Sequence, residues 1–295
     1  MTKKIRYILE YIITIMMILI FRIIGIKLSS LISAKISLII GTHLKVDKLA
    51  ISNIRNALPE LSELNRRNII NEMWLNLGRI IGEYYHICQY NLEQISAITN
   101  IDNNSKNNIE LLKKSKNGGI IVSGHIGNWE VGPKALMARG IKINILYRPL
   151  NNPYIEHLTS NLRQKYGVKL IAKSNKGNKQ IIQAIKNNEY VIILADQKIT
   201  QGQPIKFFHD YANTSTFIAK IAMKYDVPIT MASVIRKKNS KFDITVNKPL
   251  YYKNLAEEKK DFNIIKFSAI INKTLEKWIS ENPAQWFWVH DRWKK

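Results

Sequence analysis

Two residues that could carry out acid–base chemistry, His125 and Glu130, lie five positions apart in the chain. A histidine whose ring is held by a carboxylate is a general base, because the carboxylate fixes the ring tautomer and stabilises the imidazolium that forms. The pattern is short, and a loop histidine near an acidic residue in a first helical turn, where the helix dipole favours negative charge, also explains it. The spacing therefore leaves two interpretations open: a general base with its carboxylate, or a loop histidine near an unrelated acidic residue.

The elements around His125 must bring these two side chains together. Residues 120–122 are a β-branched apolar run bounded by glycines, which is typical of a buried strand. Residues 130–139 carry good helix formers and are followed by Gly140. Two helical residues five positions apart would point about 140° away from each other. We therefore expect His125 on a loop and Glu130 at or near the helix start, in the kind of strand-to-helix turn where open α/β sheets place their sites.

The composition bounds the class of protein. A chain of 295 residues is long enough for one large α/β domain with an appendage or for two small domains. Its 46% hydrophobic content excludes global disorder. The one cysteine, Cys88, excludes an intrachain disulfide and a CxxC metal or redox site. We expect no metal and no cofactor, and a structural role for Cys88 within its apolar-aromatic helical run.

The chain carries 45 Lys and Arg against 22 Asp and Glu, a formal net charge of +23. Such an excess attracts polyanions, which include anionic lipid, phosphorylated substrates, acidic proteins and nucleic acid. The basic residues are spread as single lysines or short pairs, without zinc-finger spacing, a basic region or an aromatic-basic stacking motif. We therefore expect no nucleic acid among the partners.

Strand-like and helix-like segments alternate after the turn, which predicts a mixed central α/β sheet flanked by helices. The expected strands are residues 141–147, 168–172, 190–195, 228–236 and 242–246, and the expected helices are residues 152–166, 178–186, 214–225 and 261–280. Before the turn, residues 52–90 have helical spacing with a break at 58–60, which predicts a helical appendage over residues 50–90.

The N-terminus is basic and then apolar. Residues 7–26 are apolar except for Glu10 near the start and Arg22 near the end. We predict a membrane anchor over residues 1–30, which either spans the bilayer or lies in its interface. A signal peptide and the buried helix of a soluble protein are the alternatives, and no small-residue cleavage site follows the apolar run cleanly.

Several further motifs, in order along nearly the whole chain, carry a resemblance to a known family. They follow the apolar N-terminus and are Asn-x5-Pro-Glu at 53–60, Gly-His-x4-Glu at 124–130, Tyr-Arg-Pro at 147–149 with Asn152 and Pro153, Arg163, Ala-Asp-Gln at 195–197, Phe-Phe at 207–208, a small, Thr-rich segment at 212–216, and the ending Pro283 to Arg292. The chain resembles the lauroyl/myristoyl acyltransferases of lipid A biosynthesis, within the lysophospholipid acyltransferase superfamily. Motifs in such number and order are specific.

The resemblance implies an O-acyltransferase domain over residues 31–295 that moves an acyl chain from acyl carrier protein to a hydroxyl of a Kdo-lipid A precursor. It implies His125 and Glu130 as the catalytic pair, and Arg163, Asp196 and Arg148 as substrate-binding or transition-state residues. It also implies the inner membrane, with the catalytic domain on the cytoplasmic face. The superfamily often has Asp where this chain has Glu130. Without the resemblance, surface ion pairing would explain the two arginines, and a strand-end turn would explain Asp196.

The chemistry is consistent with this reading. A base must take the proton of the attacking hydroxyl, and His125 supplies it with Glu130 as its orienting acid. Backbone N–H groups of the turn at 127–128, or Arg163, could stabilise the oxyanion, and arginines suit phosphate groups of a glycolipid. Trp286, Trp288 and Trp293 suit either the bilayer interface or the core.

Other functions stay open at this stage. A glycerophospholipid or other glycolipid acyltransferase would share the histidine-acid chemistry with a different acceptor. A membrane-tethered basic binding protein without catalysis would not need His125. A nucleic-acid-binding protein rests on net charge alone and would show a steep salt dependence.

Overall fold

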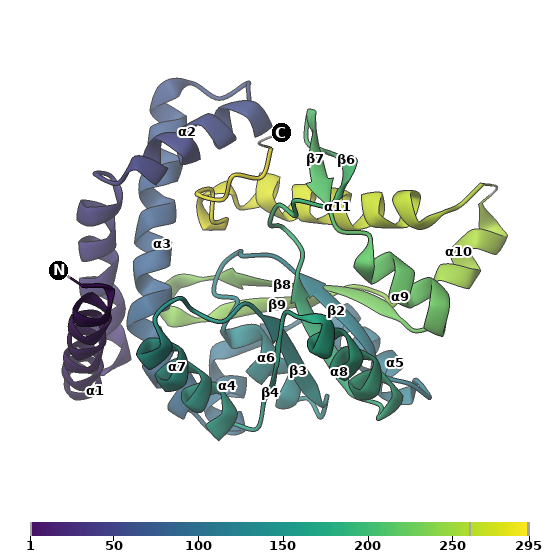
Figure 1. Ribbon diagram of the computed structural model, residues 1–295, viewed down its shortest axis with the longest axis horizontal. Coiled ribbons are helices and arrows are strands. Elements are labelled where there is room, and N and C mark those ends of the chain that lie inside the picture. The colour runs from purple at the N-terminus through teal and green to yellow at the C-terminus, as the bar shows by residue number, and fades with distance from the viewer. Residues whose placement is uncertain (1, 260, 294–295) are drawn as a thin grey trace.

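The computed structural model describes residues 2–259 and 261–293 and shows a mixed sheet with helices on both faces (Figure 1). Its strands are β1 (Thr99–Ile101), β2 (Gly119–Ser123), β3 (Ile143–Tyr147), β4 (Lys169–Ala172), β5 (Tyr190–Leu194), β6 (Gln203–Phe207), β7 (Asp210–Thr214), β8 (Ile229–Arg236) and β9 (Phe242–Val246). Its α-helices are α1 (Lys3–Gly41), α2 (Lys45–Ala57), α3 (Glu63–Gln89), α4 (Leu92–Ile98), α5 (Asn103–Lys114), α6 (Val131–Met137), α7 (Pro153–Lys165), α8 (Asn175–Lys186), α9 (Phe217–Tyr225), α10 (Tyr252–Glu258) and α11 (Ile264–Glu281).

The main sheet has seven strands in the order β1-β9-β8-β2-β5-β3-β4. Strands β2, β3, β4 and β5 pair in parallel, β8 joins β2 in parallel, and β9 is antiparallel to β8. The predicted α/β class with a mixed sheet is confirmed. Strand β2 lies at the centre, so the turn that follows it is flanked by strands on both sides.

Side chains of β2 alternate between two hydrophobic cores, as the period of a strand requires. Ile120 and Val122 belong to the core that α8, α9 and α11 cover, together with buried residues of α2 and α3. Ile121 points to the other core, which contains residues of α4, α5 and α6. Strand β2 is buried throughout because both of its faces are covered.

Helix α1 lies beside α3 at one edge of the molecule (Figure 1). It continues past residue 30 as far as Gly41 and has a kink at Gly25, where φ is +76°. Small residues carry the contact: Ser29 and Ser30 are buried, and a Cβ on Gly82 of α3 would collide with the carbonyl of Ser29. The division into an anchor over 1–30 and an acyltransferase domain over 31–295 stays a prediction.

Two helices, α2 and α3, lie where a helical segment was predicted, and the break at residues 58–60 falls between them. Their buried residues belong to the main core, and the appendage stays a prediction. Ser62 caps α3 by accepting a hydrogen bond from the backbone N–H of Asn65.

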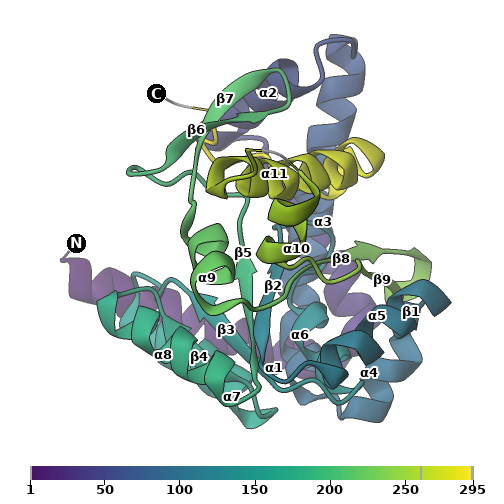
Figure 2. The same ribbon diagram turned by 90° about the vertical axis from the view of Figure 1, so that its right-hand side faces the viewer.

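The structure differs from the helix expected over residues 214–225. Helix α9 begins only at Phe217, and the segment before it is β7, which pairs with β6 in an antiparallel hairpin. Figure 2 shows this hairpin near α11, where Asn272 donates to the carbonyl of Lys206 at 2.9 Å.

Candidate active site

His125 lies on the loop after β2, and Asp196 follows β5, the parallel neighbour of β2. Ser123 of β2 pairs with Leu194 of β5, and His125 and Asp196 each follow two positions after these paired residues. The carboxyl ends of parallel strands meet at one edge of a sheet, where α/β proteins place their sites. The fold therefore brings together two predicted site residues that are 71 positions apart in the chain.

Asp196 holds His125 through two hydrogen bonds. Its Oδ1 lies 2.8 Å from Nδ1 of the His125 ring, and its Oδ2 accepts the backbone N–H of the same residue at 2.6 Å. The indole N–H of Trp286 also donates to Oδ2, at 2.8 Å. Asp196 is fully buried, which alone would raise its pKa. The charge and hydrogen bonds of His125, with the nearby His290, outweigh burial and lower the pKa of the carboxyl below its ordinary value.

An ionised Asp196 can only accept hydrogen bonds, so Nδ1 of His125 carries the proton. The lone pair of the ring is then on Nε2, the nitrogen that points away from Asp196. The His125 side chain is 16% exposed, which leaves it within reach of a substrate. The pair has the geometry of a general base with its orienting carboxylate.

The predicted pairing of His125 with Glu130 is corrected by the structure. Glu130 does lie at the start of α6, where it is the N-cap residue, but its carboxylate binds Arg163 of α7. Arg163 donates from Nε to Oε2 at 3.1 Å and from Nη2 to Oε1 at 2.6 Å. The Glu130 carboxylate thus accepts two hydrogen bonds from one guanidinium, and the carboxylate bonded to the His125 ring is that of Asp196.

The Glu130–Arg163 pair is held within the protein. Its two side chains are only 12% and 18% exposed, and the guanidinium stacks over the ring of Tyr84 with 5.5 Å between its carbon and the ring centroid. Burial alone would lower the pKa of Arg163, but the Glu130 carboxylate raises it above its ordinary value. Arg163 therefore stays cationic, and Nη1 lies outside its hydrogen bonds to Glu130.

The turn between His125 and Glu130 depends on Gly127. Its φ is +60°, and a Cβ there would collide with the carbonyl of Val234. Its N–H donates to the carbonyl of Gln285 at 3.0 Å, and its carbonyl accepts from the Asn76 side chain at 2.9 Å. Since the N–H is engaged, Gly127 is not available as the predicted oxyanion donor in this conformation.

A buried polar network that the sequence analysis missed supports this turn. Asn128 donates to Oε2 of Glu83 at 2.8 Å, and Arg236 of β8 donates to both Glu83 oxygens at 2.6 and 2.9 Å. Ser30 of α1 donates to Oε1 at 2.8 Å. The Ser240 hydroxyl donates to Oε1 as well, at 3.2 Å. Because Glu83 has zero exposure, protein donors satisfy its charge, and one carboxylate connects α1, α3, β8 and the turn.

We expect Glu83→Gln to lower the free energy of unfolding by about 3–5 kcal/mol, because it leaves the Arg236 guanidinium buried without a counter-ion. Urea unfolding of the detergent-solubilised protein, followed by tryptophan fluorescence, measures this. The matched control is Glu110→Gln, which removes the carboxylate that pairs with Lys113 on the surface and has an expected cost of about 0–1 kcal/mol. Equal losses in the two variants would contradict the role assigned to Glu83.

The C-terminal tryptophans belong to the core. Trp286 and Trp288 have zero exposure and Trp293 has 9%, so the alternative of a bilayer-interface position is wrong. Trp286 packs against Trp288 with ring centroids 4.6 Å apart. Through its bond to Asp196, Trp286 makes the C-terminal segment part of the site.

Arg148 does not join the cluster. It is exposed in the loop between β3 and α7, and no hydrogen bond or ion pair of the described residues connects it to His125.

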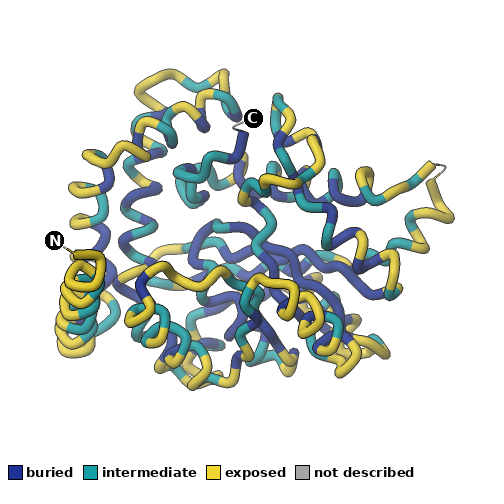
Figure 3. Tube along the Cα trace, viewed as in Figure 1, coloured by how far each residue is buried: buried dark blue, intermediate teal, exposed yellow. Residues whose placement is uncertain are grey.

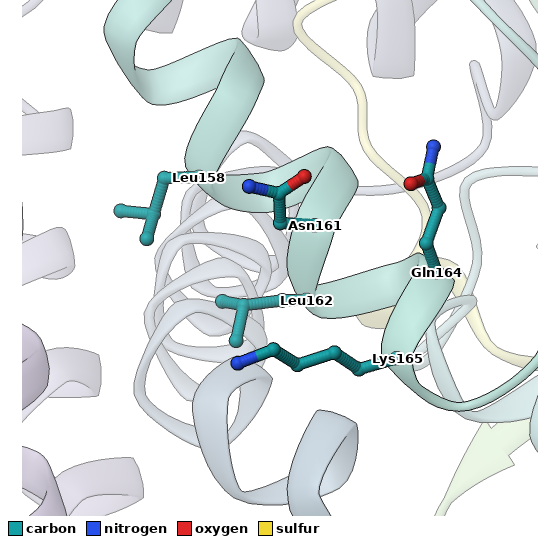
Figure 4. A pocket seen from close by; sticks show the side chains of 5 residues that line it. All are labelled: Leu158, Asn161, Leu162, Gln164 and Lys165. Atoms are coloured by element: carbon teal, nitrogen blue, oxygen red, sulfur yellow. The ribbon is translucent and has the colours of Figure 1, made fainter.

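The hollow in Figure 4 runs along α7, and none of the residues that line it is a predicted site residue; they are Leu158, Asn161, Leu162, Gln164 and Lys165. Within residues 2–259 and 261–293, no group of three or more His, Cys, Asp or Glu side chains could hold a metal ion.

The fold and the site define an α/β protein with a histidine–aspartate pair at the carboxyl ends of adjacent parallel strands. The whole chain, residues 1–295, matches the family described as bacterial lipid A biosynthesis acyltransferase, and it belongs to that family. It is similar to a lipid A biosynthesis acyltransferase of Haemophilus influenzae, with 21% identity over 272 residues that cover 89% of this chain and 80% of the relative.

A solved structure is also similar to the chain. It is the 1-acyl-sn-glycerophosphate (LPA) acyltransferase PlsC from Thermotoga maritima, with a TM-score of 0.40 and 11% identity. The likeness covers 82% of this chain and 96% of that one.

Proposed function

We propose that this protein transfers a fatty acyl chain from an acyl carrier protein thioester to a hydroxyl of a Kdo-lipid A precursor. The observation that carries the proposal is the bond between His125 Nδ1 and Asp196, in a chain of the lipid A acyltransferase family. This bond leaves Nε2 as an oriented base, which is the group that an alcohol needs when it attacks a thioester.

In the proposed reaction, Nε2 of His125 takes the proton of the acceptor hydroxyl as its oxygen attacks the thioester carbonyl carbon. Asp196 stabilises the imidazolium that forms. The tetrahedral intermediate then collapses, the new ester C–O bond stays and the C–S bond breaks. The imidazolium returns its proton to the departing thiolate, so the enzyme ends in its starting state without a metal, a cofactor or a protein nucleophile.

Arg163 and Glu130 have a separate role in this proposal. The buried guanidinium is a fixed positive charge on α7, and Glu130 holds it in one orientation through two hydrogen bonds. Arg163 would stabilise the developing oxyanion or a phosphate of the glycolipid, for which a planar cation is suited. Exposed Arg148 would act only in binding, through phosphate groups at the rim.

Helix α1 supports attachment to a membrane. Among the described residues it is the one helix long and apolar enough to cross a bilayer, and only 11% of its most apolar 18-residue window is buried. Figure 3 shows its N-terminal turns largely exposed. Large apolar side chains with more than two-fifths of their surface exposed project from these turns, at Ile5, Leu9, Ile12, Ile13, Met16, Leu19, Ile20 and Ile23.

The same turns also contact the catalytic part of the chain, since Asn152 at the start of α7 donates to the Tyr7 carbonyl and to Glu10, both at 2.9 Å. We propose that α1 attaches the protein to the cytoplasmic face of the bacterial inner membrane. The positive net charge would favour anionic lipid, the phosphorylated acceptor and the acidic carrier protein.

Incubation of the purified full chain with acyl-acyl carrier protein and a Kdo-lipid A precursor tests the proposal, with lysophosphatidate as the competing acceptor. Mass spectrometry should find the glycolipid heavier by one acyl chain and the lysophosphatidate largely unchanged. Preferred acylation of lysophosphatidate would overturn the acceptor assignment. Absence of any acylated product, with the same components accepted by a known acyltransferase, would overturn the enzyme reading.

A further inference from the structure

Two side chains beyond the His125–Asp196 pair, Gln197 and His290, lie next to the His125 ring. The amide nitrogen of Gln197, in the loop after β5, lies 3.4 Å from Nε2 of His125. The same nitrogen lies 3.1 Å from Nε2 of His290, in the C-terminal segment. The two imidazole rings are edge to face with centroids 5.1 Å apart, so Gln197 bridges a pair of neighbouring histidines.

The protonation states match this bridge. In the neutral His125 ring, Nδ1 carries the proton that is donated to Asp196 and Nε2 carries the lone pair, so the group that faces Nε2 is a donor. Burial, followed by the nearness of His125, lowers the pKa of His290 to about 4, so this ring is neutral near pH 7. An amide NH₂ group has two N–H donors, one for each of the two Nε2 lone pairs.

His290 is held in place by the fold. The side chain of Asn53 in α2 donates to the carbonyls of Trp288 and His290 at 2.7 and 2.6 Å. The N–H of Phe287 donates to the carbonyl of His125 at 3.0 Å, and the Phe287 ring packs edge to face on His290 with 4.9 Å between centroids. His290 is therefore positioned by the same segment that binds the catalytic loop.

Gln197, in contrast, is exposed and lies where a hydroxyl must approach. A hydroxyl that gives its proton to Nε2 of His125 must first displace the Gln197 N–H from that nitrogen. The freed N–H is then next to the incoming oxygen, while the second N–H still donates to His290. The arrangement thus offers the oxygen a donor at the same moment that His125 accepts its proton.

We propose that Gln197 binds the oxygen of the acceptor hydroxyl, and that His290 is a positioning residue that holds the Gln197 amide for this purpose. This inference rests on the acyl transfer proposed above. It assigns acceptor recognition to Gln197 and His290, and it leaves the acyl donor to other residues.

Initial rates with the acceptor and the acyl donor varied in turn test this assignment. Gln197→Ala should lower kcat/KM for the acceptor about tenfold or more, the loss of one well-placed hydrogen bond, with KM for the donor within about twofold of wild type. His290→Ala should have the same pattern, and His290→Gln, which keeps an acceptor for the amide, should recover part of the loss. Gln183→Ala, at an exposed glutamine of α8, is the control and should be neutral.

The double variant Gln197→Ala/His290→Ala separates positioning from an independent contribution. Because His290 is proposed to act through Gln197, the double variant should be no slower than Gln197→Ala alone. Losses that multiply, an equal rise in KM for the donor, or wild-type rates in Gln197→Ala would each overturn the inference while the acyl transfer stands. A wild-type protein that acylates no acceptor would overturn the proposed function, and this inference with it.

Discussion

Asp196→Asn is expected to lower kcat for acyl transfer by about 10⁴, with the fold intact. An amide at this position presents either its N–H₂ or its carbonyl to His125 and no longer stabilises the imidazolium, so the ring loses both its tautomer and its counter-charge. Steady-state rates at saturating donor and acceptor measure the effect.

The control for the loss of one carboxylate charge is Asp226→Asn, at an exposed residue paired with Lys253. It is expected to keep wild-type rates, because a partly exposed ion pair far from the site contributes little. An Asp196→Asn variant within tenfold of wild type, with an unchanged melting temperature, would show that another group orients His125.

His125→Ala is expected to lower turnover at least as far as Asp196→Asn does, by about 10⁴ or to the limit of detection, because the hydroxyl then attacks without a base to take its proton. The same rate assay measures it, with folding checked by circular dichroism. His157→Ala, at an exposed histidine of α7, is the matched control and should be fully active.

The two catalytic variants also predict a combined result. Since Asp196 acts through His125, the double variant His125→Ala/Asp196→Asn should be about as slow as His125→Ala alone. A double variant slower by the product of the two single effects would contradict the pair. Wild-type turnover in His125→Ala would show that His125 is not the base of the reaction.

The sequence was sufficient to predict the central strand and its turn. The β-branched run at 120–122 between glycines has no helical periodicity, and the structure places β2 there. Glu130 was expected at a helix start and is the N-cap of α6. These features depend on neighbours in the chain, so local propensity determines them.

The partner of His125 could not be derived in this way. Which carboxylate reaches Nδ1 depends on β5 being the neighbour of β2, and strand order is a property of the whole sheet. The signal that was available is the position of Asp196 directly after the buried strand at 190–195, at the edge where His125 was expected. The resemblance indicated Asp196 as a site residue without its role as the orienting acid.

The hairpin of β6 and β7 was missed for a different reason. Its strand sequence Gln-Pro-Ile-Lys-Phe contains a proline and only one buried residue before Phe207, so it resembles a polar loop. Asn272 and Arg292, distant in the sequence, bind this hairpin through the carbonyls of Lys206 and Asn213. Tertiary contacts, which a local pattern does not contain, stabilise the hairpin.

The nitrogen NMR spectrum of the wild-type protein with ¹⁵N-labelled histidine, compared with the Asp196→Asn and Glu130→Gln variants, tests the central claim most directly. For His125, assigned by its loss in His125→Ala, we predict a protonated Nδ1 and an unprotonated Nε2 in the neutral ring. We predict that Glu130→Gln preserves this tautomer and that Asp196→Asn abolishes its dominance. A His125 tautomer that survives Asp196→Asn and is lost in Glu130→Gln would contradict the account.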